Sequence, residues 1–368
     1  MKYRRFGKTN LNLSVFSLGT MRCLASEENA IQTVQRALEL GINHVETARG
    51  YGESERYLGR ALAHLSLRPF ITTKLVPPTD PVELRRQLEE SLNRLGLQSV
   101  DALALHGINT PEHLRLALAC QETLHQLQQE GLFRHLGFST HGSLELIQTT
   151  LRTGLFEFVN LHYYWSNPRN VVAVQLAADL DIGVFIISPA DKGGLLHTPS
   201  TKLRDLCQPF SPLALNYRFL LSDSRIHTLS LGAATPQELD TPLAFADQDE
   251  TLSAEEQVAL ARLEAALQTL GPERCAQCYA CIPCPEEIQI PEVLRLRNLA
   301  VALDMEAYGQ YRYRMFENAG HWFPGRKGNR CNDCGDCLPR CPQELDIPAL
   351  LRDAHEQLHQ GEGRRLWG

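Results

Sequence analysis

The alternation of short apolar runs with longer amphipathic segments, from residue 1 to about residue 270, constrains the fold most strongly. Eight of the apolar runs are typical of buried strands. They are Val15–Leu18, Asn43–Thr47, Phe70–Lys74, Val100–Leu105, Arg134–Phe138, Phe156–Asn160, Val184–Ser188 and Thr228–Leu231. Repeated strand and helix with short links predicts a parallel sheet, and eight such units favour a closed (β/α)8 barrel, a TIM barrel, over a doubly wound sheet.

The segments between these strands have helical periodicity. They are Glu27–Leu40, Ser54–His64, Pro81–Leu95, Pro111–Glu130, Ser143–Arg152 and Asn170–Leu180. Gly41, Gly96 and Gly183 stand near helix ends, where a left-handed glycine commonly caps a helix. The opening segment YRRFGKTNLNLSV predicts a β-hairpin that closes the bottom of the barrel.

A domain boundary is expected after Ser253–Leu270, which is predicted to be a last helix. Ser253 is its N-cap and Glu256 stands three residues on, which is the pattern of a capping box. Gly271–Pro272 then interrupts the chain. We therefore expect a barrel domain over residues 1–271 and a mostly helical domain over residues 272–368, with helices at Pro291–Glu317 and Ile347–His359.

Charge and hydropathy exclude some classes of partner. The chain has 36 basic and 43 acidic residues and a formal net charge of -7, which does not predict a surface for nucleic acid. No run approaches the roughly 18 apolar residues of a membrane span, and the N-terminal MKYRRFGKTN has no apolar stretch behind it. The expected location is the cytoplasm, without a membrane partner.

Four polar residues stand at or just beyond the ends of consecutive predicted strands. Glu46 and Lys74 end the second and third strands, Tyr51 follows Glu46 by five residues, and His106 ends the fourth strand. Reactive groups of (β/α)8 barrels lie at these C-terminal ends, so the four side chains could converge. A lysine ammonium is expected to lower the pKa of a neighbouring tyrosine, and such a tyrosine could donate a proton to a developing alkoxide.

Eight of the eleven cysteines fall in two runs near the C-terminus. The first run holds Cys275, Cys278, Cys281 and Cys284, and the second holds Cys331, Cys334, Cys337 and Cys341. The second run has the C-x2-C-x2-C-x3-C-P spacing of bacterial ferredoxins, which predicts two [4Fe–4S] clusters in which the fourth cysteine of each run binds the cluster of the other. The first run is one residue shorter in its last gap. Zinc is the competing metal, because C-x2-C pairs also form S4 sites.

The barrel segment resembles the aldo/keto reductase family. The matching stretches are MKYRRFGKTNLNLSVFSLGT, GINHVETARGYGESERYLGRAL, FITTKL, DALALHG, LGFSTH, FIISPADKGGLL and LGAATPQEL. The resemblance implies hydride transfer between a nicotinamide cofactor and a carbonyl or alcohol substrate, with Tyr51 as general acid, Lys74 tuning it and His106 orienting the carbonyl. The family has an aspartate where this chain has Glu46. We expect the ion pair to Lys74 to survive with altered geometry, which could slow the reaction.

The same resemblance implies a set of cofactor contacts. They are Gly19, Thr20, Ser139, Asn160, Ser188, Gly232, Ala234 and Gln237. Asn160 stands where the family usually has a glutamine, and Ile187 where an aromatic ring often stacks on the nicotinamide. Ala233 and Glu238 replace the basic residues of members that prefer NADP, and Pro242 replaces an asparagine. The family's habit favours NADP(H), with NAD(H) close behind.

A barrel followed by two cysteine runs resembles the branch of the aldo/keto reductases that carries a ferredoxin-type domain. The main hypothesis is therefore a reductase of a small carbonyl substrate with two attached clusters, which could exchange electrons with a ferredoxin-like partner. The alternative is an electron-transfer or docking protein that uses the barrel as a scaffold. A group of basic and aromatic residues could form the docking face: Tyr311, Arg312, Tyr313, Arg314, Trp322, Phe323, Arg326, Lys327 and Arg330.

Overall fold

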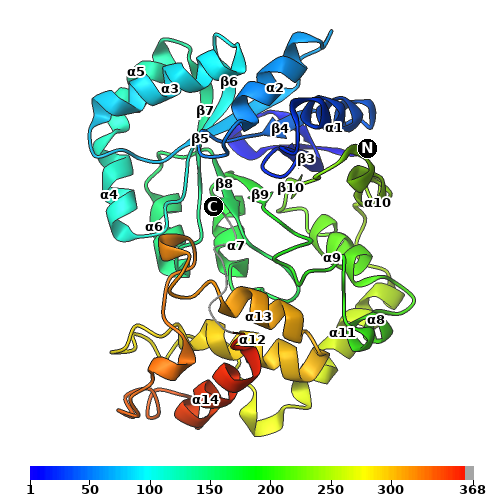
Figure 1. Cartoon of the computed structure of the whole chain (residues 1–368), viewed down its shortest axis with the longest axis vertical. Coiled ribbons are helices and arrows are strands. Elements are labelled where there is room, and N and C mark those ends of the chain that lie inside the picture. Colours follow the sequence, from blue (N-terminus) through cyan, green and yellow to red (C-terminus); the bar gives the residue numbers. More distant parts are fainter. Residues whose placement is uncertain (361–368) are drawn as a thin grey trace. The chain divides into compact units, whose positions relative to one another are not determined.

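The computed structural model describes residues 1–360, and its N-terminal part is a closed barrel of eight parallel strands (Figure 1). In chain order the strands are β3 (Phe16–Gly19), β4 (His44–Glu46), β5 (Phe70–Leu75), β6 (Val100–Leu105), β7 (Phe133–Ser139), β8 (Phe158–Leu161), β9 (Gly183–Ile186) and β10 (Thr228–Leu231). Each strand pairs with the next one, and β10 pairs with β3 to close the ring. The predicted barrel and all eight predicted strands are confirmed.

Helices follow the strands along the chain and surround the barrel (Figure 1). They are α1 (Glu27–Glu39), α2 (Ser54–Ala63), α3 (Pro81–Leu95), α4 (Pro111–Ala119), α5 (Gln121–Gln129), α6 (Leu144–Arg152), α7 (Val171–Asp179), α9 (Pro212–Leu221) and α10 (Asp240–Leu243). The helix predicted over Pro111–Glu130 is two helices that meet at Cys120. Side chains of Asp80, Thr110 and Ser143 accept backbone N–H groups at the starts of α3, α4 and α6, which satisfies donors that a helix start leaves unpaired.

The predicted N-terminal hairpin is present, with β1 (Tyr3–Arg5) antiparallel to β2 (Asn12–Ser14). Its Phe6, Leu11 and Leu13 belong to one buried apolar cluster with side chains of the barrel strands, namely Ala102, Ala104, Phe158 and Phe185. Gly183 does not cap a helix, because it begins β9, and the left-handed residue before it is Asp181 with φ of 52°. A Cβ on Gly183 would lie 2.7 Å from the ring of Phe6, so this glycine makes room for the hairpin.

Strand register places the polar residues at one end of the barrel. Glu46 is level with Gly19 on β3 and with Thr72 on β5, and Lys74 is level with Ala104 on β6. Ser139 at the end of β7 is level with Asn160 on β8. The C-terminal ends of six neighbouring strands therefore carry most of the residues that the sequence singled out.

The cysteine-rich part is helical, as predicted, with α12 (Ile290–Leu303), α13 (Glu306–Tyr313) and α14 (Ile347–Leu358). Two helices from the range predicted for the barrel, α8 (Thr201–Cys207) and α11 (Ala254–Gln268), belong to the same compact unit. The predicted capping box at Ser253 and Glu256 starts α11. The helix predicted over Pro291–Glu317 is wrong as one piece, because Asp304 takes a left-handed conformation with φ of 52° and ends α12. Helices α11, α13 and α14 all contact α12.

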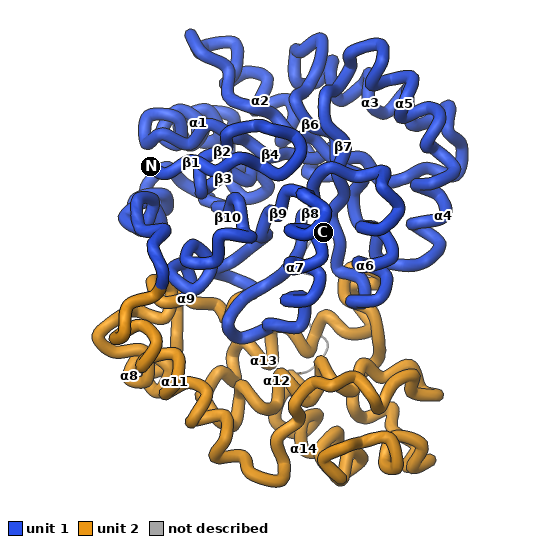
Figure 2. The backbone as a smooth tube through the Cα atoms, turned by 180° about the vertical axis from the view of Figure 1, so that it is seen from behind, with its two compact units in different colours: residues 1–192, 216–251 blue, residues 193–215, 252–368 orange. Residues whose placement is uncertain are grey.

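The chain divides into two compact units, coloured separately in Figure 2. One unit contains residues 1–192 and 216–251, and the other contains residues 193–215 and 252–368, of which residues up to 360 are described. The chain thus passes between the units more than once, and the boundary near residue 271 stays a prediction.

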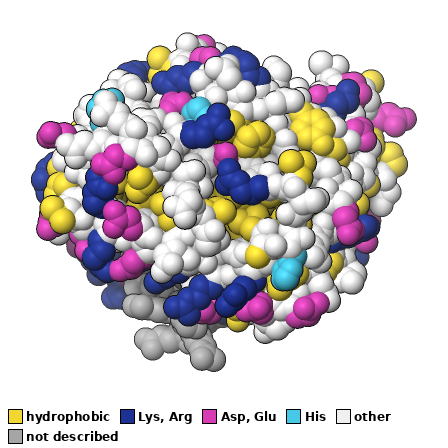
Figure 3. All heavy atoms as spheres, turned by 90° about the horizontal axis from the view of Figure 1, so that it is seen from above, with side chains coloured by type: hydrophobic (Ala, Val, Ile, Leu, Met, Phe, Trp, Pro, Cys, Tyr) yellow, Lys and Arg dark blue, Asp and Glu magenta, His cyan; other side chains and the backbone are white. Residues whose placement is uncertain are grey.

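The surface has no strong bias of charge on the face drawn in Figure 3, where side chains of both signs alternate with apolar ones. This mixture agrees with the small net charge of -7. Across residues 1–360, no helix has both the length and the apolar character that a membrane crossing requires.

Candidate functional site

Lys74 is the centre of the polar group in the barrel. Its side chain is 2% exposed, and its Nζ lies 3.0 Å from Oε1 of Glu46 and 3.2 Å from the hydroxyl of Tyr51. A third bond of 3.1 Å runs to the carbonyl oxygen of Thr47. Because an ammonium group has three donors, the buried charge of Lys74 is fully satisfied. Glu46 therefore forms the ion pair in spite of its extra methylene group.

Burial determines whether the pKa of Tyr51 lies above or below its usual value. Burial raises the pKa of Tyr51 above its usual 10, and the neighbouring Lys74 lowers it without offsetting that effect. The expectation of a lowered pKa is therefore wrong in its net direction. Burial by itself lowers the pKa of Lys74, but Glu46 and Tyr51 together raise it above its usual 10.5. At neutral pH the pair is a protonated phenol beside a charged ammonium, which is the form that can donate a proton.

His106 completes the group that the sequence predicted. Its ring meets that of Tyr51 edge to face with 5.6 Å between centroids. The loop after His106 is held by the next strand, because Gly107 donates its N–H to the Ser139 hydroxyl at 3.0 Å and Thr140 donates its hydroxyl to the Ile108 carbonyl at 2.7 Å. The structure thus brings together Glu46, Tyr51, Lys74 and His106, the four predicted catalytic residues.

Glu46 and Asn160 depart from the family pattern in opposite directions, and the structure joins them. Asn160 is fully buried, and its Nδ2 donates a short hydrogen bond to the same Glu46 oxygen that pairs with Lys74. Relative to the family, Glu46 is one methylene longer and Asn160 is one methylene shorter. We infer that the two changes compensate, because the combined length of the two side chains is kept.

This compensation predicts coupled variants. Glu46→Asp alone leaves an arm too short to reach both Lys74 and Asn160, and Asn160→Gln alone crowds the longer Glu46. For the carbonyl reduction proposed below, we expect each change to lower kcat/KM about tenfold, which is about 1.4 kcal/mol, and the double variant to recover most of the loss. Glu53→Asp, at an exposed ion pair with Arg56, is the control. Additive losses in the double variant would contradict the compensation.

Asn160 also offers a contact to a nicotinamide. Its Oδ1 is buried and has no hydrogen-bond partner among residues 1–360. A buried acceptor without a donor is costly, so a ligand that supplies an N–H group would stabilise it. The carboxamide of a nicotinamide has such a group, and the residues present therefore fit this cofactor.

The other predicted cofactor contacts at the strand ends differ in the space around them, in their hydrogen bonds and in their backbone conformation. A Cβ on Gly19 would lie 2.8 Å from the Ser230 hydroxyl, so a larger residue there would displace that side chain. Thr20 uses its hydroxyl within the protein, 3.0 Å from the Glu46 carbonyl and 2.6 Å from the Ser54 hydroxyl. Ser188 is half-buried and left-handed, with φ of 51°.

The loop of Gly232, Ala234 and Gln237, which was expected to contact the cofactor, already contains a carboxylate. The N–H of Ala234 donates to Oε2 of Glu238 at 3.0 Å. Arg22 donates to the Gly232 carbonyl at 2.8 Å and lies 3.3 Å from the same Glu238 oxygen. Gln237 is exposed. One backbone donor of this loop is therefore used by the chain's own acid.

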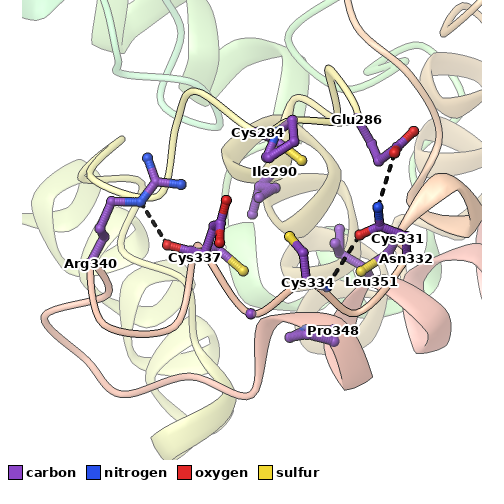
Figure 4. A pocket seen from close by; sticks show the side chains of 13 residues that line it. Cys284, Glu286, Ile290, Cys331, Asn332, Cys334, Cys337, Arg340, Pro348 and Leu351 are labelled. Atoms are coloured by element: carbon purple, nitrogen blue, oxygen red, sulfur yellow. Dashed lines mark hydrogen bonds between the residues drawn. The ribbon is translucent and has the colours of Figure 1, made fainter.

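A cavity in the second unit collects cysteines from both runs. Figure 4 shows the sulfur atoms of Cys284, Cys331, Cys334 and Cys337 around this hollow, with Ile290, Pro348 and Leu351 as apolar lining. Cys284 comes from the first run and the other three from the second. This is the crossed set expected for one of the two clusters. Thiol sulfur with an apolar lining suits an iron–sulfur cluster, so the residues present fit it.

Three contacts link the two runs at matching positions. Glu286 stands two residues after the fourth cysteine of the first run, and it accepts a hydrogen bond from Asn332, which follows the first cysteine of the second run. In the same way, Gln343 stands two residues after the fourth cysteine of the second run and accepts from Ala276, which follows the first cysteine of the first run. These bonds are 3.0 Å each, from the Asn332 side chain and from the Ala276 N–H. Arg340, just before Cys341, donates to the carbonyl of Pro283, just before Cys284, at 2.9 Å. The contacts hold each fourth cysteine against the opposite run.

The second unit contains an internal repeat that was not expected from the sequence. The segment CPEEIQIP leads into α12, and the segment CPQELDIP leads into α14. Each segment begins at the fourth cysteine of its run, and each helix begins six residues after that cysteine. The left-handed residues also correspond: Gln277 with Asp333, Tyr279 with Gly335, and Glu287 with Glu344. The repeated C-P-x-E-x-x-I-P signal was visible in the sequence and indicates two equivalent cluster-binding halves.

The thiols of the two runs are not paired as disulfides in the structure. Burial raises the pKa of Cys281 to about 12, and it also raises those of Cys275 and Cys337. Metal binding requires thiolates, so loading of these sites must release protons. No three His, Cys, Asp or Glu side chains within residues 1–360 form a group suited to a single metal ion.

Three of the five cations in the basic group expected to form a docking face contact other side chains of the chain. Arg312 is buried with its guanidinium 4.3 Å from the centre of the Phe323 ring. Arg330 pairs with Glu317 at 2.8 Å and Arg326 with Glu286 at 3.2 Å. These cations therefore hold local structure rather than standing as a free positive patch.

A histidine chain beside the barrel site had not been expected. Tyr164 donates its hydroxyl to the Ile187 carbonyl, which can only accept. His162 must therefore donate from Nδ1 to the Tyr164 oxygen, 2.5 Å away, and its Nε2 then accepts from Nδ1 of His141 at 3.1 Å. The positions follow strands β7, β8 and β9, a place that the strand-end rule could have indicated.

Comparisons with known proteins match both parts of the chain. The model of the aldo/keto reductase family matches residues 16–259, and that of a 4Fe-4S dicluster domain matches residues 274–345. The NADH-specific methylglyoxal reductase of Escherichia coli (strain K12) is 23% identical over 327 residues, covering 71% of this chain and 100% of that protein. L-galactose dehydrogenase of Arabidopsis thaliana is 24% identical over 310 residues, covering 73% and 95%. The aldo-keto reductase AKR11C1 of Bacillus halodurans, in its holo form, has the same fold with a TM-score of 0.64, at 23% identity over 71% of this chain and 96% of that chain.

Proposed function

Because the chain belongs to the aldo/keto reductase family, we propose that it transfers hydride between a nicotinamide cofactor and a small carbonyl or alcohol, and that its second unit carries two [4Fe–4S] clusters. The observation that carries the reductase proposal is the buried group in which Lys74 contacts both Glu46 and the hydroxyl of Tyr51. A proton donor, a charge that supports it and an oriented histidine are what carbonyl reduction requires of the protein.

In this proposal a bound dihydronicotinamide supplies the hydride. Asn160 holds the carboxamide through its unpaired Oδ1. Tyr51 donates its hydroxyl proton to the oxygen of the carbonyl as negative charge develops there, and His106 orients that oxygen. Lys74 stabilises the phenolate left on Tyr51 because its charge lies 3.2 Å from the phenol oxygen. General acid catalysis of this kind typically contributes about 10² to 10⁴-fold.

The test is a binding titration followed by turnover. We expect NADH or NADPH to bind the full chain, and oxidation of the bound form to accelerate with aldehydes or 2-oxoaldehydes. Methylglyoxal belongs in the panel because one relative is named for its reduction. Absence of binding to both nucleotides would contradict the reductase and favour a barrel that acts as a scaffold for an electron-transfer protein.

We propose that NADH is preferred over NADPH, although the family's habit favours NADP(H). The carboxylate of Glu238 lies in the loop expected to contact the cofactor, at a place where members that prefer NADP carry a basic residue, so it would repel a 2'-phosphate. We expect NADPH to bind at least about tenfold more weakly than NADH, and Glu238→Gln to narrow that ratio through tighter NADPH binding. The control is Glu39→Gln, which removes an exposed charge of α1. Equal affinities in the unaltered protein would contradict this preference.

The cluster proposal assigns Cys275, Cys278, Cys281 and Cys341 to the first site, and Cys331, Cys334, Cys337 and Cys284 to the second. It is supported by the cavity shared between the runs and by the matching dicluster model. In this role the second unit exchanges single electrons with a ferredoxin-like partner. Anaerobically purified protein should be brown and contain iron with inorganic sulfide. A colourless protein loaded with zinc would exclude the clusters.

A further inference from the structure

The two cysteine runs have one pair of equivalent positions with opposite chemistry. Gln277 and Asp333 each stand two residues after the first cysteine of a run and directly before the second. Both take the left-handed conformation, with φ of 56° and 57°. The backbone therefore treats the two positions alike, and the two halves differ there in the side chain.

The group that faces the first sulfur differs between the two runs: it is a backbone N–H in the first run and a side-chain carboxylate in the second. In the first run the N–H of Gln277 donates to Sγ of Cys275 at 3.4 Å. In the second run Oδ1 of Asp333 lies 3.9 Å from Sγ of Cys331. A hydrogen bond to a ligating sulfur and the net charge near it both set the potential of an iron–sulfur cluster.

Arg352 is the counter-ion of Asp333. Its Nη1 lies 2.7 Å from the same Oδ1 that faces Cys331. The side chains of Arg352 and Asp333 are 54% and 60% exposed, so water and salt weaken both charges. The charge nearest to the Cys331 sulfur, that of Asp333, therefore has the largest effect on the second site. The wider second site also contains Asp336 and Arg340, which have opposite charges, and Glu286, which pairs with Arg326 at 3.2 Å. Asp333 therefore remains the charge that most clearly distinguishes the two halves.

We propose that the second site, formed by Cys331, Cys334, Cys337 and Cys284, is harder to reduce than the first, and that Asp333, moderated by Arg352, sets the difference. The inference rests on the proposed clusters. Each site gains one electron on reduction from [4Fe–4S]2+ to [4Fe–4S]1+, and no proton or bond changes. The added negative charge is opposed by the carboxylate of Asp333 and favoured by the N–H of Gln277.

The experiment is a potentiometric titration of the full chain with dithionite, followed by EPR. We expect two midpoint potentials. Asp333→Asn should raise the lower one, Arg352→Gln should lower it, and Gln277→Asp should lower the upper one. Both replacements at the paired positions introduce residues that accept a left-handed conformation. Asp304→Asn is the matched control, because Asp304 is also a left-handed aspartate and pairs with Lys202 away from both runs.

The outcomes separate this inference from the proposed function. A protein that forms no iron–sulfur chromophore overturns the cluster assignment and the inference with it. A protein that forms both clusters but in which Asp333→Asn moves neither potential, or moves the upper one, overturns the inference alone. A shift of equal size in the lower midpoint potential of Asp304→Asn would also overturn the inference, because the effect would then come from the total charge of the protein and not from the position of Asp333.

Discussion

Replacement of Tyr51 by phenylalanine is expected to lower kcat for carbonyl reduction by about 10² to 10⁴-fold. The change removes the hydroxyl that lies 3.2 Å from Lys74 and keeps the ring that meets His106. The proton donor is lost while the shape of the site is kept, so the dissociation constant of the nucleotide should change little. Tyr57→Phe on α2 is the matched control and should retain full activity.

The pH dependence of the unaltered protein provides a second readout of the same proposal. Burial keeps the pKa of Tyr51 above its usual 10, so the phenol stays protonated through the neutral range. The reduction rate should therefore be nearly constant from about pH 6 to about pH 9 and fall only at higher pH, as Tyr51 loses its proton.

Retention of more than about a tenth of the activity in Tyr51→Phe would contradict the assignment of Tyr51 as the acid.

The residues of the barrel site could be located from the sequence because a simple rule places them. Parallel strands of a barrel end on one face, so polar residues at the ends of consecutive strands must be neighbours. Glu46, Lys74 and His106 followed that rule. The net direction of the Tyr51 pKa did not follow from the neighbouring residue, because the burial that outweighs Lys74 arises only when the whole barrel encloses the site.

Interactions between distant segments were hidden from the sequence. The sequence shows Glu46 and Asn160 as two separate departures from the family pattern, whereas the structure joins them across 114 positions in one hydrogen bond. Gly183 looked like a helix cap because it follows a helical segment, but its role is to admit Phe6 of the hairpin. Local patterns predict elements, and such long-range fits require the folded chain.

The crossed assignment of the cysteines predicts how paired substitutions combine. Cys284→Ala should remove one cluster and lower the iron content by about half, because the second site loses its fourth thiolate. Adding Cys331→Ala should remove no more iron, since both residues are assigned to the same cluster. Adding Cys275→Ala to Cys284→Ala should instead remove nearly all of it. Cys207→Ala, at a buried cysteine outside both runs, is the control.

An uncrossed arrangement predicts the reverse, and so the pairs of variants decide between them. If Cys284 bound the cluster of its own run, it would be Cys275→Ala that removed no further iron and Cys331→Ala that removed the rest. The contacts from Arg340 to Pro283 and from Asn332 to Glu286 argue against that arrangement, because they hold Cys284 beside the second run. The gap of two residues between Cys281 and Cys284 does not prevent crossing, since the cavity already places Cys284 beside Cys331, Cys334 and Cys337.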